Sequence, residues 1–189
     1  MPTSKEHLLR IAFEEIYHNG YAATSVDKIL KKANMNKGSM YHFFKSKKEL
    51  VLAVIDERVK NYIEDKYSVL LKVENNICEA LMDLIKERNS FDFSCGCKLN
   101  NLVQELSPKD SDFKIALERV YIKFESIIEE VLNKAVANNE ITHSDTKALS
   151  MYVVASIEGC LGTAKKSQDG TYFHTCISQL EYFLNTLKK

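Results

Sequence analysis

Residues 24–50, TSVDKILKKANMNKGSMYHFFKSKKEL, form the stretch of sequence that decides the fold. The stretch predicts two short helices joined by a tight turn and followed by the start of a third helix. Thr24 or Ser25 can cap the first helix, and Asn34 tolerates the left-handed backbone conformation that ends it. The apolar residues of this first helix recur at helical spacing and predict one buried face: Val26, Ile29, Leu30 and Ala33.

The second short helix is predicted to begin after Asn36, which can cap it. Its apolar residues Met40, Phe43 and Phe44 are expected to point into the protein. Its other side chains stay available to a partner: Lys37, Ser39, Tyr41 and His42. A helix, a tight turn and a second helix with such an outer surface are typical of helix-turn-helix proteins that bind DNA.

Ser46 and Glu49 form a predicted capping box at the start of the third helix. Lys45, Lys47 and Lys48 surround this helix start. The free backbone amides of the first turn and the lysine ammonium groups would both attract a phosphate. The alternative interpretation is a solvated corner of a helical bundle that binds no DNA.

This segment resembles the DNA-binding region of the TetR family of transcriptional regulators. The family signature is similar to T-S-V/I-x-x-I-x-x-x-A-x-V-S-K-G-T/S-x-Y-x-H/Y-F-x-S-K-E-x-L. The resemblance covers residues 5–55, because the preceding helix and the Asn19-Gly20-Tyr21 break also resemble the family's first helix and its stop. Two positions depart from the pattern. Asn36 stands where serine is usual, and Phe43, which cannot donate a hydrogen bond, stands where histidine or tyrosine is usual.

The resemblance also implies roles for individual residues of the helix-turn-helix. It implies phosphate contacts from Thr24, Ser25, Tyr41, His42 and Lys47, and approach to base edges by Lys37, Gly38 and Ser39. The function that it implies is a repressor that binds a palindromic, double-stranded DNA operator and is released by a small effector or by cysteine modification.

The amino-acid composition is that of an ordinary globular protein, with 189 residues, 45% of them hydrophobic and 28% charged. The net charge of zero conceals an asymmetry. Residues 1–48 contain nine Lys or Arg against four Asp or Glu, and the remaining residues contain seventeen against twenty-two. A basic N-terminal part with an acidic remainder is typical of a protein that places one end on nucleic acid.

The hydrophobic periodicity predicts an all-α fold with two domains: an N-terminal three-helix, helix-turn-helix domain at 1–48 and a larger helical domain at 49–189. The family resemblance implies that the larger domain is a regulatory and dimerisation domain. Thr3 and Glu6 form a predicted capping box for a helix that ends at Asn19, and the third helix is expected to run on toward Lys72. Five further helices are expected at about 75–89, 98–106, 112–138, 145–166 and 171–187.

The last two predicted helices carry wide apolar faces, from Leu149 to Leu161 and from Phe173 to Leu187. These faces predict either an ordinary pair of core helices or, in two copies, the four-helix interface of a homodimer. The family resemblance implies the homodimer. A dimer is also expected on physical grounds, because a single helix-turn-helix makes too few contacts to be specific.

The five cysteines, together with the absence of a signal peptide or a membrane span, predict a cytoplasmic protein with reduced thiols. Cys78, Cys160 and Cys176 lie on apolar helix faces and are expected in the core. Cys97 stands at a predicted helix start next to Lys98, where free amides and the ammonium group would favour its thiolate.

The run GCKLNNLVQELSPKDSDFKIAL, residues 96–117, resembles the Gly-Cys segment of a TetR subgroup that includes the electrophile-sensing repressor NemR. The resemblance implies that Cys97 is a sensor thiol, with Cys95 as an accessory thiol. The alternative is that Cys97 is a buried structural residue. The Cys95-x-Cys97 spacing does not suit zinc, so no metal site is predicted.

The effector is not identified by the sequence. Aromatic residues of the middle helices are compatible with a pocket for a small apolar ligand or with ordinary core: Phe91, Phe93, Phe113, Tyr121, Phe124 and Tyr152. A ferritin-like metalloenzyme is the competing class, since Glu140 and His143 show Glu-x-x-His spacing, but that spacing occurs only once. With no phosphate loop or catalytic motif either, the sequence predicts no enzyme and no cofactor.

Overall fold

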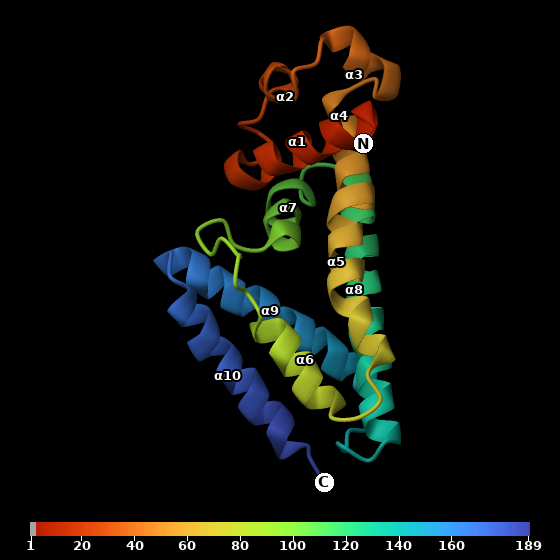
Figure 1. Ribbon diagram of the computed structural model, residues 1–189, viewed down its shortest axis with the longest axis vertical. Helices are drawn as coiled ribbons and strands as arrows, with labels where there is room; N and C mark the ends of the chain where they lie inside the picture. Colours follow the sequence, from red (N-terminus) through yellow and green to blue (C-terminus); the bar gives the residue numbers. More distant parts are fainter. Residues whose placement is uncertain (1–2) are drawn as a thin grey trace. The chain divides into compact units, whose positions relative to one another are not determined.

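The computed structural model describes residues 3–189, and within that range it contains helices and one isolated antiparallel bridge, between Ile141 and Lys188, but no strand. This confirms the predicted all-α fold (Figure 1). The α-helices are α1 Ser4–Asn19, α2 Val26–Ala33, α3 Lys37–Phe43, α4 Lys47–Val54, α5 Lys60–Tyr67, α6 Ile77–Lys86, α7 Lys98–Leu106, α8 Ser111–Ala137, α9 Thr146–Ser167 and α10 Gly170–Thr186.

The predicted long third helix is a continuous helical run with changes of pitch. A π-helical turn, Ile55–Val59, joins α4 to α5, and a 3-10 turn, Ser68–Lys72, ends the run. The π turn carries two of the buried side chains, Ile55 and Val59. Among the described residues, none of the helices combines the length and apolar character that crossing a bilayer requires.

The chain divides into two compact units. The N-terminal unit comprises the described residues through Tyr62 together with Lys98–Val120, and the C-terminal unit comprises Ile63–Cys97 and Tyr121–Lys189. The division at residue 48 predicted from the sequence stays a prediction. The compact N-terminal unit takes in more of the chain, because α7 and the first part of α8 belong to it.

In the N-terminal unit, the apolar faces of α1, α2 and α4 are buried together. The helix starts are set by the predicted caps. Thr3 and Glu6 form the expected capping box, and Ser25 accepts a hydrogen bond from the Lys28 amide. Ser46 caps α4, although the Glu49 carboxylate accepts from the amide of Lys45 instead of closing a full box.

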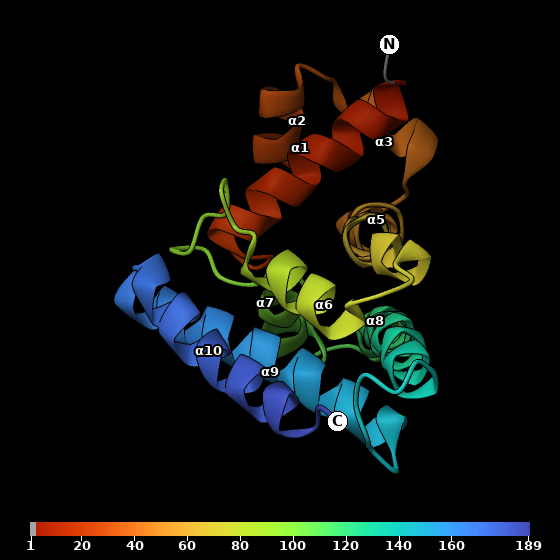
Figure 2. The same cartoon turned by 60° about the horizontal axis from the view of Figure 1, so that its bottom comes forward.

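In the C-terminal unit, α9 and α10 lie side by side in both views (Figures 1 and 2). Their buried residues include Val153 and Ile157 of α9 and Phe173 and Ile177 of α10. Tyr152 departs from the expected apolar face, because it is exposed and packs edge-on against Phe183.

Cys160 of α9 and Cys176 of α10 form a disulfide. The prediction that these two cysteines are free core thiols was therefore wrong. Their Cα atoms lie 5.4 Å apart, within the range that a disulfide needs, because the two residues face each other across the α9–α10 contact. Cys78 is a buried free thiol, as predicted, and burial raises its pKa to about 11.

The Glu140 and His143 pair that suggested a di-iron site has a local structural role. The Glu140 carboxylate accepts the backbone amide of Ile77 at 2.7 Å, at the start of α6, where Asn76 provides no side-chain cap. His143 accepts the amide of Asp145 just before α9. Both side chains satisfy backbone donors near helix starts, which is a sufficient reason for their presence.

Candidate DNA-binding face and regulatory cluster

The turn between α2 and α3 has the predicted construction. Asn34 adopts the left-handed conformation, with φ 52° and ψ 45°, and its amide donates to the end of α2. The Asn36 carboxamide caps α3 by accepting the amide of Ser39 at 2.8 Å. The usual serine at position 36 is therefore replaced by an equally good capping residue.

The inner side of α3 is formed by Met40, with Phe44 just after the helix, and both are buried as predicted. Phe43 is not buried: 36% of it is exposed, so the prediction of an inward side chain was wrong for this residue. Phe43 is the last residue of α3, so no further turn of this helix follows to cover its side chain.

The outer side of α3 carries the side chains predicted to meet DNA. Gly38, Tyr41 and His42 are exposed, and 55% of Tyr41 is accessible. Gly38, Ser39, His42 and Phe43 border an open hollow beside the turn. Lys37 forms an exposed ion pair with Asp27 at 2.9 Å, and the hydrogen bond that its ammonium donates to Asp27 raises the pKa of Lys37. The face is therefore polar, accessible and supported by a buried inner side.

Thr24 does not belong to this exposed face. Its side chain is fully buried, and its hydroxyl donates to the carbonyls of Gly20, at 2.7 Å, and Glu15, at 3.2 Å. Thr24 therefore has no accessible side chain with which to reach a phosphate, although a family resemblance had implied such a contact. The neighbouring Ser25 is exposed and caps α2.

Lys47, at the start of α4, is half-buried. Its ammonium donates to the carbonyl of Tyr21 at 2.6 Å and lies 3.9 Å from the centre of the Tyr21 ring. Burial lowers the pKa of Lys47, while the nearby Glu105 charge opposes the change. An ammonium group has three donors, so this lysine can hold Tyr21 and still offer hydrogen bonds outward.

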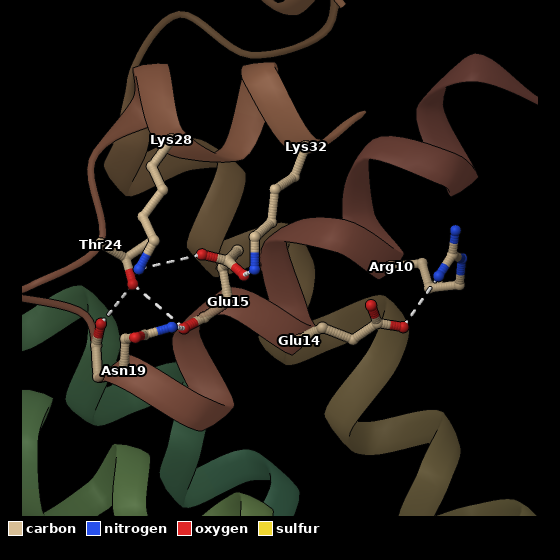
Figure 3. Close-up of polar contacts among 8 residues, drawn as sticks. Arg10, Glu14, Glu15, Asn19, Thr24, Lys28 and Lys32 are labelled. Atoms are coloured by element: carbon tan, nitrogen blue, oxygen red, sulfur yellow. Dashed lines mark hydrogen bonds and ion pairs between the residues drawn. The ribbon is translucent and has the colours of Figure 1, made fainter. Parts of the chain in front are cut away.

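Glu15 of α1 is a buried carboxylate under the helix-turn-helix (Figure 3). It receives a hydrogen bond from Lys32 of α2, and its Oε2 lies 3.3 Å from Lys28 without hydrogen-bond geometry. Burial raises the pKa of Glu15, but the two lysines outweigh burial and hold the pKa below its ordinary value. Glu15 therefore fixes α2 against α1 through charge as well as packing.

A second carboxylate, that of Glu105 near the end of α7, holds the turn that leads into α2. Its two oxygens accept the backbone amides of Tyr21 and Ala22, both at 2.8 Å. Gly20 makes this approach possible, because it has a positive φ of 79° and a Cβ there would lie 3.1 Å from the Glu105 carboxylate. We call this arrangement of Glu105 with the 20–22 turn the α7 latch.

A lysine beside the latch completes the attachment within the N-terminal unit. Lys48 of α4 forms ion pairs with Asp110 and Asp112, each at 2.7 Å, around the start of α8. Its hydrogen bond is the main reason that the pKa of Asp110 is lowered. The start of α4 is thus tied to the start of α8 and to the residue just before it, and Lys48, although partly exposed, is engaged in these ion pairs.

The Gly-Cys motif lies in the loop that follows α6, within the C-terminal unit. Gly96 is buried with φ 73°, and a Cβ there would come within 2.7 Å of the Lys165 side chain, so only glycine fits. Cys97 is partly buried, and its thiol donates to the Glu158 carboxylate of α9 at 3.1 Å. The structure therefore places a buried carboxylate at the predicted sensor thiol.

Glu158 is 7% exposed, and burial raises its pKa to about 7, although the Cys97 hydrogen bond and the charge of Arg88 oppose the change. Arg88, also buried, lies in the loop after α6. Burial raises the pKa of Tyr121, and the charge of Glu158 adds to that increase. These groups form a buried polar cluster that we call the Arg88–Glu158 cluster.

The two neighbours expected to assist Cys97 have other partners. The Lys98 ammonium lies over aromatic rings of the N-terminal unit, 4.2 Å from the Tyr62 ring centre and within 6 Å of Phe13 and Tyr17. The Cys95 thiol donates to Asp92 at 3.2 Å, and burial and that bond raise its pKa. Cys95 is therefore less acidic than an ordinary cysteine.

The predicted aromatic pocket residues do not form one group. Phe113 packs edge-on against Tyr21 in the N-terminal unit, and the rings of Phe124 and Tyr67 pack at a tilt in the core of the C-terminal unit. Phe91 and Phe93 contact each other beside the Arg88–Glu158 cluster.

Sequence reasoning missed four charged residues: Glu15, Arg88, Glu105 and Glu158. The three carboxylates accept hydrogen bonds from partners that are 17 to 84 residues away in the sequence, so no local pattern indicates their roles. Glu15 had the most accessible signal, because a charged residue interrupts the buried face of the first helix beside Ile16.

Comparison with known proteins gives a consistent result over most of the chain. Residues 4–54 match the family described as bacterial regulatory proteins, tetR family, and residues 75–179 match the C-terminal domain described as LmrA/YxaF-like transcriptional regulator. An uncharacterized HTH-type transcriptional regulator from the lacX 3' region of Lactococcus lactis subsp. lactis is 32% identical over 170 residues, covering 88% of this chain and 85% of that protein. The HTH-type transcriptional regulator LmrA of Bacillus subtilis strain 168 is 30% identical over 186 residues, covering 94% and 96%.

Solved structures show the same fold. The crystal structure of the reduced form of E. coli NemR has a TM-score of 0.86 and covers 99% of this chain and 98% of that one, at 21% identity. At that identity the likeness establishes the fold alone. The regulatory protein TetR from Rhodobacter sphaeroides has a TM-score of 0.78 at 26% identity, covering 92% and 94%.

Proposed function

Because the chain belongs to the TetR family of bacterial regulatory proteins, we propose that this transcriptional regulator is a repressor that binds a palindromic operator as a homodimer and is released by an effector. The observation that carries the proposal is the outer side of α3, a polar and accessible face above a buried inner side. A helix with this construction, preceded by a second helix across a tight turn, fits the major groove.

The contacts that we propose divide into two kinds. Ser25, Tyr41, His42 and Lys47 bind phosphates, which supply affinity without sequence information. Lys37, Gly38 and Ser39 approach base edges. The Asp27 partner keeps Lys37 extended on the surface in the free protein, and the base edge replaces that exposed ion pair, which is weak in water.

Selection of DNA fragments by the purified protein tests the repressor proposal. Random or genomic fragments retained at about 150 mM salt are expected to share a palindrome with half-sites about 34–36 Å apart. A reporter gene placed behind that palindrome should be silenced by the protein. Retention without any shared sequence would contradict the proposal. Activation of the reporter would mean that the protein is an activator and not a repressor.

The proposed dimer forms through α9 and α10. On α9, Met151, Gly159 and Gly162 are exposed on one side, and a Cβ at either glycine would meet nothing within 4 Å. On α10, 70% of Tyr182 is exposed. Small residues beside exposed apolar ones allow two helix pairs to pack closely, which supports a four-helix interface.

Release requires a connection from the regulatory cluster to the DNA-binding face. Cys97 directly precedes α7, and α7 carries Glu105, whose carboxylate holds the 20–22 turn. We propose that modification of Cys97 or binding of an effector shifts α7, which opens the latch and changes how α2 and α3 are held. An effector can act this way only if it favours the shifted state over the DNA-bound state.

Cys97 is the proposed sensor thiol, with Cys95 as an accessory. With a quinone as electrophile, the Cys97 sulfur forms a bond to a ring carbon, and the thiol proton passes through the Glu158 carboxylate to one quinone oxygen. The hydrogen on the attacked ring carbon is then lost as a proton and moves through water to the other oxygen, which leaves a hydroquinone thioether. Glu158 suits this transfer because it already accepts the thiol hydrogen bond and its pKa is about 7.

Operator release by benzoquinone tests this role. The parent protein and Cys95→Ser are expected to release the operator, and Cys97→Ser is expected to retain it. Cys95→Ser is the matched control, because it removes a thiol from the same loop. Equal release by the parent and Cys97→Ser would exclude the redox role and leave a noncovalent effector.

A further inference from the structure

We propose that the Arg88–Glu158 cluster is the effector site and that it binds a small carboxylic acid with a compact apolar body and a hydroxyl or amino group. This inference rests on the proposed function, because it names the chemical class of the effector. It is carried by two buried ionisable side chains in one unit, one basic and one acidic, that both keep atoms without hydrogen-bond partners.

The unpartnered guanidinium of Arg88 is the stronger of the two observations. It is 8% exposed, and its Nη2 donates one long hydrogen bond, 3.4 Å, to the Tyr67 hydroxyl. Its Nε and Nη1 are buried and lack a hydrogen-bond partner. No ion pair joins Arg88 to a carboxylate within residues 3–189. Buried guanidinium groups are normally paired, so this one is suited to an anion from outside the chain.

Glu158 supplies the second observation. Its Oε1 accepts the Cys97 thiol, while Oε2 is buried without a partner. The charge of Arg88 is close enough to lower the pKa of Glu158, yet the two groups form no ion pair. Two opposite charges that served only the fold would gain by pairing directly. A molecule with an anionic oxygen for Arg88 and a hydrogen-bond donor for Glu158 would satisfy both.

The surroundings of Arg88 define the rest of the ligand. The guanidinium carbon lies 5.5 Å from the Phe91 ring centre and 5.3 Å from that of Phe173, and Phe93 packs 5.6 Å from Phe173. Gly170 leaves room for Phe93, because a Cβ there would lie 2.6 Å from that ring. Aromatic walls around a cation favour a small acid with an apolar body over a highly polar metabolite.

The test is binding of defined small acids to the purified full-length protein. The probes are 2-, 3- and 4-hydroxybenzoate and 3-hydroxybutyrate, with the matching hydroxybenzamides as controls that lack the negative charge. At least one acid is expected to bind by calorimetry at least tenfold more tightly than its amide. Absence of binding by every acid at millimolar concentration, or equal binding of acid and amide, would overturn the inference.

Two variants assign the binding to this cluster. Arg88→Met keeps the volume and removes the charge, so it is expected to lose at least tenfold in affinity for the acid. Its melting temperature is expected to stay equal or rise, because an unpaired buried charge is removed; a structural arginine would give a lower melting temperature. Glu158→Gln is expected to keep carboxylate binding and lose the preference for the hydroxyl group. Unchanged acid binding by Arg88→Met places the site elsewhere and overturns the inference.

Operator binding separates this inference from the proposed function. Unliganded Arg88→Met is expected to bind the selected operator like the parent, because Arg88 lies outside the DNA-binding unit. The acid should release the parent from the operator and leave Arg88→Met bound. Acid binding without release would overturn the effector role, whereas failure to select any operator would instead count against the proposed repressor.

Discussion

Among the residues that the structure describes, Glu15 of α1 is the carboxylate that pairs with the α2 lysines Lys28 and Lys32 (Figure 3). Replacing it by glutamine is expected to lower the free energy of unfolding by about 1–2 kcal/mol at pH 7, because Lys28 and Lys32 lose their common partner but remain partly in water. Glu14→Gln is the matched control: Glu14 pairs with Arg10 on the surface, and its loss should cost less than about 0.5 kcal/mol. Equal effects of the two variants in urea denaturation would contradict the assignment.

The pH dependence of this effect has a definite sign. The folded pKa of Glu15 is lowered from 4.5, so the carboxylate stabilises the folded protein fully above about pH 4.5 and progressively less as the pH falls through the folded value. The stability difference between the parent and Glu15→Gln should therefore shrink in acid, as denaturation at a series of pH values would show. A difference that grew in acid would mean that the carboxylate is not held ionised.

Substitutions of Tyr41 and Ser39 test the two proposed kinds of DNA contact, to phosphates and to base edges. Tyr41→Phe is expected to weaken binding to all DNA sequences alike, because its exposed hydroxyl is assigned to a phosphate. Ser39→Ala is expected to change the preferred base, by about 1–3 kcal/mol at most for a specific contact. Tyr172→Phe, an exposed tyrosine in the other unit, is the control for the first variant. Gel-shift titration on specific and scrambled DNA measures both effects.

At the scale of helices, the α7 latch holds the turn that leads into α2 by a single side chain, that of Glu105. Glu105→Gln leaves one acceptor oxygen for two amides, so it is expected to lower the melting temperature by the equivalent of about 1 kcal/mol. Operator affinity should fall with it, because the turn into α2 loses one of its supports. Gln104→Glu, next to it on the exposed side of α7, serves as the control. Unchanged operator affinity in Glu105→Gln would remove the latch from the proposed release pathway.

At the scale of the whole molecule, the proposed dimer depends on side chains that are exposed in the single chain. Gly162→Glu and Tyr182→Glu are expected to yield folded monomers that no longer bind the operator tightly, because a charge would be buried at the centre of the interface. Ile122→Glu, a charge placed on exposed apolar surface of α8, should remain dimeric. Sedimentation at micromolar concentration measures the oligomeric state. A dimeric Gly162→Glu protein would show that the dimer forms through another surface.

The sequence predicted most helices because their caps and apolar spacing are local. Ser25, Asn34 and Asn36 define the turn through hydrogen bonds to residues within four positions, so periodicity and capping rules found it. The α7 latch, the Glu15 anchor and the Cys160–Cys176 disulfide join residues from different elements, and no local rule reports them. Thr24 shows the limit of a family pattern: its place in the motif is kept, while its side chain is buried.

The α7 latch also has a consequence for how this protein can be observed. Tyr21 and Ala22 lie in a surface turn, where backbone amides ordinarily exchange their hydrogens with water rapidly. Here the Glu105 carboxylate holds both amides, so their exchange should be slow while the latch is closed. If an effector acts through α7, the exchange of these two hydrogens should speed up when the effector binds, even when no DNA is present. The exchange rates of the Tyr21 and Ala22 amides would thus indicate whether the latch is open or closed, and measuring them needs neither a label nor knowledge of the operator.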